Sequence, residues 1–361
     1  MSGFIPLSPE EEFEARVARH EMDAEAKAEA SRRIAERRHA QLDRMSRLTP
    51  GGDFGLDEPE TIPAVWGKGE LVLWAEGEGL MILAEQGLGK TTIAQQLTLS
   101  MIGVRADALL GLTVKQATGP VLYLAMDRPR QAARSLSRMI GEADRTALNE
   151  RLVVWRGPLP LDITASPQAL ADWAQEVAPG CSVIVADSVK DFAPGLAKDE
   201  VGAALNLAWQ EVIARGIDLL LLHHPRKDSE GKPSLNAAYG STWLTAGLGS
   251  VIQLTGARGA AEVKLHHVKQ PSEIVGPWVV EHDYASGTSV RGIGSVEDYL
   301  LLKFTDPSPQ TVQTVAEGMG MSEKSARARL EKLVEAGKVI KTEPVQTADG
   351  RSPAVYTLRV A

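Results

Sequence analysis

One glycine-rich tract constrains the fold of this chain more than any other feature. Residues 84–92, AEQGLGKTT, follow the apolar run LMIL and open the helix-forming run TTIAQQLTLSMIG. A glycine-rich loop between a strand and a helix turns successive backbone N–H groups toward one point, where the helix dipole also favours an anion. The order of strand, loop and helix therefore predicts a phosphate-binding loop. Its expected members are Glu85, Gln86, Gly87, Leu88, Gly89, Lys90, Thr91 and Thr92.

The residue types in this tract indicate ATP and Mg²⁺ as cofactors. Lys90 is expected to bridge the β- and γ-phosphates, and the Thr91 hydroxyl is expected to ligate the metal ion. The usual first glycine of such a loop is Ala84 here, which is small enough to leave room for the turn. The alternative is a chance glycine-rich turn before a helix, and the Gly-Lys-Thr-Thr sequence after a strand argues against it.

A second candidate for the metal site ends another apolar run. Residues 181–188, CSVIVADS, predict a buried strand that finishes at Asp187. A carboxylate at the end of a neighbouring strand can hold a water molecule bound to Mg²⁺, which is the Walker B arrangement. An aspartate at a strand end is also commonly just the N-cap of the next helix. The phosphate loop favours the metal role for Asp187.

Alternating apolar runs and helical stretches predict an α/β domain over residues 60–292, with a mostly parallel sheet covered on both faces. The run LVLWAEGEGLMILAE is expected to form two paired strands. Further strands are expected at VLYLAM, SVIVAD, DLLLLHH and SVIQLTG, and helices at 129–141, 167–177 and 200–214.

The order of these motifs resembles a known family. AEQGLGKTT, VLYLAMDRPRQAARSLSRM, VIVADSVKDF and LLLLHHPRKD follow one another as in the RecA-fold ATPases of the RepA type, the DnaB-related hexameric replicative helicases of plasmids and phages. The resemblance covers roughly residues 60–290. It implies a RecA-like P-loop ATPase core that forms a ring and moves along single-stranded DNA.

The resemblance implies catalytic roles at two strand ends. Family members carry an acidic residue in a tract like YL-x-x-E-D-P, where it polarises the attacking water; here Asp127 stands in place of the glutamate and is one methylene shorter. The alternative for Asp127 is the N-cap of the following helix. His224 takes the place of the γ-phosphate sensor, with His223 packed alongside, and its alternative is a satisfied polar residue.

The polar stretch after His224 takes the place of a DNA-facing loop. Residues 227–234, KDSEGKPS, predict a mobile loop, and such loops line the channel of ring helicases in the family. Lys227 and Lys232 are therefore candidates for contacts with the phosphates of single-stranded DNA.

This sequence differs from the family at the positions of the trans-acting cation. Tyr239 stands where an arginine usually precedes the Gly-Ser pair. In the later tract LHHVKQP, Lys269 matches the lysine of the DnaB-type K-x-R element and proline replaces its arginine. We expect Lys269, or else Arg258 or Arg226, to act at the subunit interface. The alternative for Lys269 is a solvated lysine at a strand end.

The last part of the chain, residues 293–361, resembles a winged helix-turn-helix. Three short helices are expected, the third capped by Ser322 and ended by Gly337, followed by the paired strands KVIKTEPV and AVYTLRV. Exposed positions of the third helix and the wing are candidates for duplex DNA contact; these are Lys324, Ser325, Arg327 and Arg351. Nearby glutamates keep this region close to neutral, so a protein-docking domain is the alternative.

The first part, residues 1–59, is expected to be a charged helical arm and linker. Residues 9–47 are rich in Ala, Glu and Arg with opposite charges three and four apart, and the helix is expected to stop before the breakers at 49–52. The arm is either a solvated or partly disordered segment or a helix that docks on a neighbouring subunit.

Composition limits the remaining function classes. A net charge of −8 argues against wholesale coating of nucleic acid, and the single cysteine excludes a disulfide framework. We expect a cytoplasmic protein with no membrane partner, because the first residues are acidic and no apolar run reaches the length of a span.

The sequence as a whole favours an ATP-driven DNA helicase of a mobile element such as a phage or plasmid. The expected partners are single-stranded DNA in a central channel, duplex DNA or a protein at the winged helix, and other copies of the chain, most simply as a hexamer. Two other functions stay open. One is a RecA-like recombination or helicase-loading ATPase that binds DNA without translocating, and the other is a nucleotide-controlled DNA-binding regulator with weak hydrolysis.

Overall fold

The computed structural model describes Met22 and residues 47–226, 233–283, 285–292, 299–300, 303, 310–319, 321–342, 346–347, 350–351 and 353–359. The chain forms two compact units, Met1–Pro59 and Glu60–Ala361. Most of the predicted N-terminal arm lies outside the described residues. In the first unit residues 48–50 are not helical, and a short exposed helix, α2 (Gly51–Leu56), begins at the two glycines of the predicted breaker cluster. Pro50 is the N-cap of this helix, and the Asp53 carboxylate in the first turn interacts favourably with the helix dipole.

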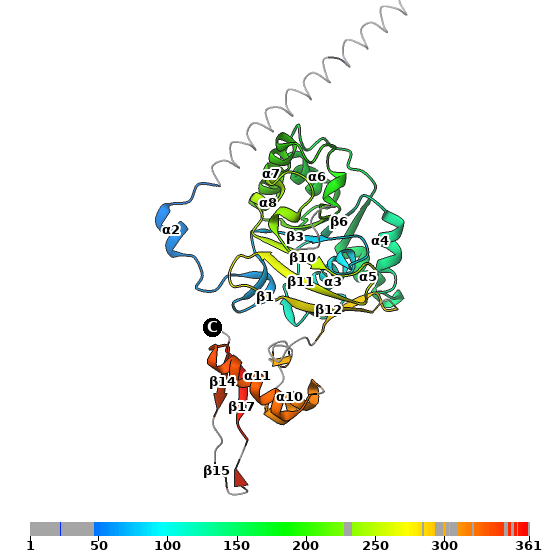
Figure 1. Cartoon of the computed structure of the whole chain (residues 1–361). Coiled ribbons are helices and arrows are strands. Elements are labelled where there is room, and N and C mark those ends of the chain that lie inside the picture. The colour runs from blue at the N-terminus through cyan, green and yellow to red at the C-terminus, as the bar shows by residue number, and fades with distance from the viewer. Residues whose placement is uncertain are drawn as a thin grey trace, which may run out of the picture. The chain divides into compact units, whose positions relative to one another are not determined.

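The second unit is built around a nine-stranded sheet in the described residues (Figure 1). Six neighbouring strands are parallel, and three antiparallel strands extend one edge. In spatial order the strands are β13 (Thr288–Arg291), β12 (Trp278–Asp283), β11 (Glu262–Lys269), β10 (Ser250–Thr255), β3 (Gly79–Ala84), β9 (Asp218–His223), β8 (Val183–Asp187), β6 (Val121–Ala125) and β7 (Leu152–Arg156). This arrangement confirms the predicted α/β fold with a mostly parallel sheet.

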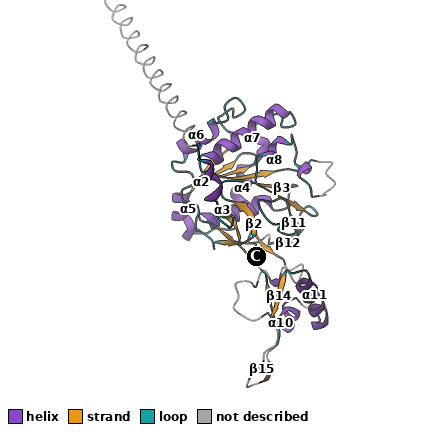
Figure 2. Ribbon diagram, turned by 90° about the vertical axis from the view of Figure 1, so that its left-hand side faces the viewer, coloured by secondary structure: helices purple, strands orange, loops and turns teal. Residues whose placement is uncertain are grey.

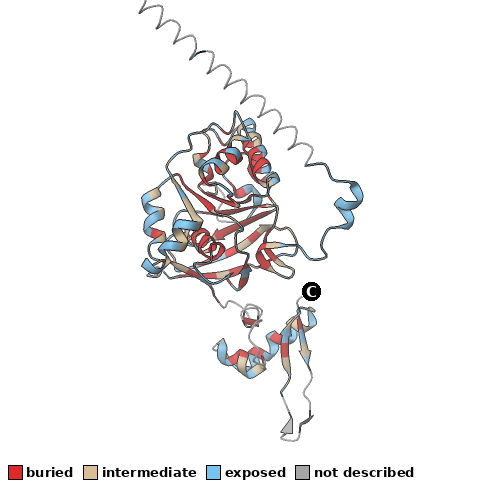
Figure 3. Cartoon of the chain, turned by 180° about the vertical axis from the view of Figure 1, so that it is seen from behind, coloured by how far each residue is buried: buried red, intermediate tan, exposed pale blue. Residues whose placement is uncertain are grey.

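The central strands are buried on both faces, which explains why they are almost continuously apolar. Along β3, Leu80 and Ile82 point into one hydrophobic core, whereas Met81 and Leu83 point into the other. Figure 3 shows these strands as the most buried part of the unit.

Helices cover both faces of the sheet (Figure 2). The helix α3 packs in the core of the first face, whereas α6, α7 and α8 pack in that of the second. The helices are α3 (Lys90–Met101), α4 (Pro129–Leu136), α5 (Arg145–Arg151), α6 (Ala169–Val177), α7 (Asp199–Ala214) and α8 (Trp243–Ala246), with short 3₁₀ turns at Glu142–Asp144, Val189–Asp191 and Leu235–Ala237. The helix predicted at 129–141 therefore ends early, at Leu136.

A smaller sheet corrects one strand pairing. The strand β2 (Leu71–Ala75) does not pair with β3, although the two follow one another in the sequence. It pairs with β1 (Ala64–Lys68), which in turn pairs with β5 (Leu112–Val114), while β4 (Ala108–Leu109) completes the sheet. Both edges of β3 are taken by the parallel partners β10 and β9, so no edge is left for β2.

The described part of the C-terminal region has its own apolar core. It contains α10 (Val312–Gly318), α11 (Glu323–Glu335) and β14 (Val339–Thr342), which pairs antiparallel with β17 (Val355–Leu358); the short strands β15 (Gln346–Thr347) and β16 (Gly350–Arg351) pair between them. The Ser322 hydroxyl caps α11 by accepting from the backbone N–H of Ser325, as predicted. Ala326 and Leu330 on α11 are fully buried in this core. The first helix predicted in this region falls mostly outside the described residues.

Within the described ranges, none of the helices has the length and apolar character needed to cross a membrane.

Candidate active site

The loop after β3 has the backbone that a phosphate site requires. Gly87 and Gly89 have φ angles of +88° and +83°, in the left-handed region that residues with a Cβ rarely adopt. Gly89 precedes α3 and accepts the hydrogen bond from the N–H of Ile93 at 3.0 Å. The glycines therefore allow the chain to leave a buried strand and enter a helix within a few residues, with backbone N–H groups left at the N-terminus of α3.

Three side chains meet beside this loop. The Thr91 hydroxyl donates to Oδ2 of Asp187 at 3.0 Å, and the Tyr123 hydroxyl donates to the same oxygen at 3.2 Å. Asp187 ends β8 and Tyr123 lies on the adjacent strand β6, so the parallel register brings both to the loop. Burial raises the pKa of Asp187, although the Thr91 bond and the Lys90 charge oppose that change.

Lys90 begins α3 and is almost fully buried, with 7% of its surface exposed. Burial lowers the pKa of its ammonium group, while the charge of Asp187 opposes the change. A buried cation with only partial compensation is suited to accept a polyanion, because the phosphates of a nucleotide supply the missing negative charge.

The residues fit Mg²⁺ with a nucleotide. A hydroxyl and a carboxylate oxygen are the hard ligands that this ion prefers, and the ion characteristically takes its remaining ligands from water and phosphate oxygens. In the described part of the chain no three His, Cys, Asp or Glu side chains form a metal cluster. Thr91 and Asp187 therefore match a metal held jointly by protein and nucleotide, rather than one held by protein alone.

Asp127 lies in the same cavity and is ion-paired. Its Oδ2 is 2.8 Å from the Lys190 ammonium and 3.5 Å from Nε of Arg128. Partial burial works to raise the pKa of Asp127, but the hydrogen bond and charge of Lys190 outweigh it and the pKa is lowered. The N-cap of α4 is Arg128, and no side chain caps that helix. The capping alternative for Asp127 is therefore wrong.

The two histidines at the end of β9 differ in their surroundings: His223 is its last residue and His224 follows it. His224 faces the cavity, and burial together with the Lys90 charge lowers its pKa to about 4. His223 is fully buried; its Nε2 is 2.6 Å from the carbonyl oxygen of Tyr239, and burial lowers its pKa to about 4. Both rings are thus neutral near pH 7.

One cavity of about 900 Å³ joins these groups. The predicted site residues that line it are Gln86, Gly87, Gly89, Lys90, Thr91, Thr92, Asp127, Asp187 and His224. The tertiary structure thus brings the loop, the two aspartates and the histidine together. The electrostatic character of the cavity is mixed, since Arg128, Lys190 and Asp283 also line it.

The β12–β13 hairpin is a part of the cavity that sequence reasoning missed. Four residues of the hairpin line the cavity: His282, Asp283, Gly287 and Thr288. In the strand order the hairpin and β8 lie on opposite sides of β3. The available sequence signal was the alternation in residues 278–283, WVVEHD, which predicts that His282 shares a face with Trp278 and Val280. These three residues are the buried ones along β12.

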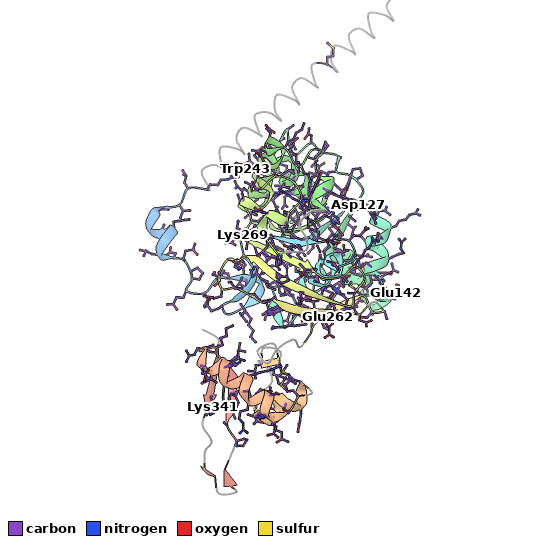
Figure 4. All side chains as sticks on the ribbon, viewed as in Figure 1. Asp127, Glu142, Trp243, Glu262, Lys269 and Lys341 are labelled. Carbon is purple, nitrogen blue, oxygen red and sulfur yellow. The ribbon has the colours of Figure 1, made fainter. Side chains whose placement is uncertain are left out.

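The candidates for a trans-acting cation lie in different places. Lys269 ends β11 and donates to the carbonyl oxygens of Thr245 and Ala246 at 3.1 and 2.9 Å, and Figure 4 shows it well apart from Asp127. Arg258 packs against the phosphate loop, within 3.3 Å of the position that a Cβ on Gly87 would take. Arg226 donates to the carbonyl oxygen of Ala238 at 3.0 Å.

The predicted DNA-binding residues are only partly described. Lys227 and Lys232 lie outside the described residues, and so does the side chain of Arg351. Lys324, Ser325 and Arg327 are exposed on α11, next to the buried Ala326.

Among the comparisons with known proteins, a family match covers the site. A match to the AAA domain family covers residues 53–230, which include the phosphate loop, Asp127, Asp187 and His224. Among solved structures, the chain is similar to one described as an ATPase domain, with 13% sequence identity, a TM-score of 0.44, and coverage of 60% of this chain and 85% of that chain. No curated protein has a significant match to the sequence. The AAA domain match and the site geometry together support an ATP-hydrolysing P-loop enzyme.

Proposed function

We propose that this chain is an ATP-driven DNA helicase, a ring-forming motor on single-stranded DNA in the replication of a mobile element. The observation that carries the proposal is the 3.0 Å contact between Thr91 and Asp187 in a cavity that also holds Lys90, Asp127 and His224. This set offers a cation for the phosphates, two oxygens for Mg²⁺, a carboxylate base and an imidazole for the γ-phosphate, which are the groups that phosphoryl transfer to water uses.

The protein's own groups divide the chemistry as follows. The loop N–H groups and Lys90 hold the phosphates, and Thr91 with Asp187 holds Mg²⁺, which neutralises charge on the phosphates when bound. Asp127 accepts a proton from water and orients it for attack. His224 is uncharged near pH 7, so it contacts the γ-phosphate as a hydrogen-bonding group rather than as a cation.

A short hydrogen-bonded path supports coupling between nucleotide and DNA. The backbone N–H of Tyr239 donates to the carbonyl oxygen of His224 at 3.0 Å, and the His223 ring bonds the Tyr239 carbonyl. Arg226 donates to the Ala238 carbonyl in the same segment. In this proposal a displacement of His224 by the γ-phosphate is passed to Arg226 and Tyr239. Lys227 and Lys232, which lie between these two in the sequence, are our candidates for the channel loop.

Ring assembly is part of the proposal. A P-loop site gains orders of magnitude in rate from a cation supplied by a neighbouring subunit. Lys269 is our first candidate for that cation in a hexamer because it matches the lysine of the DnaB-type element, although Lys269, Arg258 and Arg226 all contact their own subunit. Its two carbonyl partners lie at the end of α8, so it must exchange them for the neighbour's nucleotide.

The C-terminal region is proposed to be a winged helix that recruits the motor to duplex DNA. The exposed Lys324, Ser325 and Arg327 stand at the start of α11, where a recognition helix meets base edges. Arg351 is our candidate on the wing. Exposed glutamates on the same helix, including Glu331, make docking of a protein partner the alternative outcome.

Strand displacement, measured beside ATPase rates with and without single-stranded DNA, tests the function. A helicase displaces a strand, and DNA raises its ATPase rate. A recombination or loading ATPase is stimulated by DNA but displaces nothing. The Thr91→Val variant removes the hydroxyl at almost constant volume, so it should abolish both activities.

One observation favours a second function, a nucleotide-controlled DNA-binding regulator with weak hydrolysis. Lys190 holds Asp127 in an ion pair and lowers its pKa, which makes it a weaker base. A regulator binds Mg-ATP, changes its assembly with nucleotide, and hydrolyses slowly whether or not DNA is present. Single-turnover hydrolysis compared with nucleotide-dependent light scattering separates this function from the motor.

A further inference from the structure

His282 links the β12–β13 hairpin to the phosphate loop. The side chain is buried, with 7% of its surface exposed, and its Nε2 is 3.2 Å from the carbonyl oxygen of Leu88. Its Nδ1 is 2.7 Å from the hydroxyl of Ser289 on β13. Both nitrogens of the ring are therefore engaged, one of them by the backbone of the loop itself.

The partners define which nitrogen carries the proton. A carbonyl oxygen only accepts hydrogen bonds, so Nε2 of His282 must donate to Leu88. In a neutral ring Nδ1 then accepts from the Ser289 hydroxyl. Burial lowers the pKa of His282, although the Leu88 bond opposes the change, and this favours the neutral ring.

The bond to Leu88 determines where the next N–H points. The carbonyl of Leu88 and the N–H of Gly89 belong to one peptide unit, and this unit is not among the cis bonds of the chain. In a trans peptide the two groups point in opposite directions. Because the Leu88 carbonyl points to the His282 ring, the Gly89 N–H points away from that ring. Gly89 itself lines the cavity. A rotated peptide would instead present a carbonyl oxygen to the phosphates.

The surrounding contacts keep this arrangement rigid. A Cβ on Gly89 would clash with the His282 ring, so the ring fills the space that the glycine leaves. The Gln96 side chain on α3 accepts from the N–H of Ser289 at 2.7 Å and donates to its carbonyl at 3.2 Å. The hairpin is thus attached both to the loop and to the helix that follows it.

We propose that His282, supported by Ser289, is a positioning residue that orients the Leu88–Gly89 peptide so that the phosphate loop presents an N–H to the nucleotide. The proposal rests on nucleotide binding at this loop and names a residue of the hairpin as part of that function.

The test compares three variants of the full chain by titration with Mg-ATP and by steady-state kinetics. His282→Phe keeps a ring but removes the donor, and should raise Kd and KM about tenfold, the equivalent of one oriented hydrogen bond. His282→Gln returns an amide donor near Nε2 and should restore Kd to within about threefold of wild type. Ser289→Ala leaves the ring in place and should raise Kd about threefold.

His267→Phe is the matched control. His267 is equally buried on the adjacent strand, and its Nε2 is 2.7 Å from the hydroxyl of Ser250, but this pair lies beside the start of β3, away from the loop. The control should lower the melting temperature as His282→Phe does and leave Kd unchanged.

The outcomes distinguish a failure of the His282 role from a failure of nucleotide binding at the loop. If His282→Phe does not fold, the Gln and Ala variants decide the question by the same titration. A Kd equal to wild type in Ser289→Ala and in whichever His282 variants fold, while Lys90→Ala abolishes binding, overturns the positioning role and leaves the nucleotide site intact. If wild type and Lys90→Ala bind Mg-ATP alike, the proposed function itself fails.

Discussion

Replacing Asp127 with asparagine removes a proton acceptor and keeps the shape of the side chain. The Asp127–Lys190 pair is partly exposed, with side-chain exposures of 33% and 36%, so its loss costs about 0–1 kcal/mol of folding free energy. The variant should therefore fold. A positioned general base contributes about 10²- to 10⁴-fold in rate, which corresponds to about 3–5 kcal/mol of transition-state stabilisation. We expect kcat to fall by that factor.

The assay pairs steady-state ATPase measurements with Mg-ATP titration. Nucleotide affinity should stay within about threefold of wild type, because the phosphates are held by the loop and Lys90 rather than by Asp127. Asp172→Asn is the matched control, since it breaks another partly exposed aspartate pair, with Arg215, away from the cavity. Wild-type turnover in Asp127→Asn would refute the base assignment, and an equal loss in Asp172→Asn would mean that folding, not chemistry, was affected.

Further perturbations address the other parts of the chain. Lys90→Ala should abolish hydrolysis and greatly weaken Mg-ATP binding, and ATPase activity equal to wild type would contradict the phosphate-loop role. Burial lowers the pKa of His223 to about 4, below its usual 6.5, so its contribution to stability is complete above about pH 6.5 and declines as the pH falls toward 4, by about 3 kcal/mol in total. Urea unfolding at several pH values should show this decline, and His223→Gln should make it smaller, while the part due to other buried histidines such as His224 remains. Deleting residues 1–48 should reduce oligomer size and ATPase together if the arm docks on a neighbour; light scattering of a full-sized oligomer would make the arm a solvated tail. Reversing the charges of Lys324 and Arg327 should weaken duplex DNA binding in a salt-dependent way, whereas binding curves that match wild type would make the C-terminal region a protein dock.

Much of the candidate site could be predicted from sequence because its parts are local. The glycines at 87 and 89, the lysine and the threonine act through backbone geometry and spacing within a few residues, and a strand that ends in aspartate is visible as an apolar run. Lys90, Thr91 and Asp187 could therefore be predicted as site residues from the sequence. The parallel sheet could be predicted as well, because strands buried on both faces are almost continuously apolar.

Other features had no local signal. The sequence places β2 next to β3, yet hydrogen bonding across the sheet gives both edges of β3 to β9 and β10, which lie far away in the chain. Asp127 is an ion-paired carboxylate rather than a helix cap, and its partner Lys190 follows the next strand of the sheet. Predicted helix limits failed where capping and tertiary contacts, rather than composition, decided them, as at Leu136.

The sequence by itself determined which chemical groups this protein has and which short segments hold them, because propensity, turns and motif spacing act over neighbouring residues. Only the tertiary structure decided which groups meet. Thr91 reaches Asp187 across 96 residues, and His282 reaches the Leu88 carbonyl across 194. Such contacts depend on strand order and register, which arise from packing the whole sheet and which no local pattern encodes.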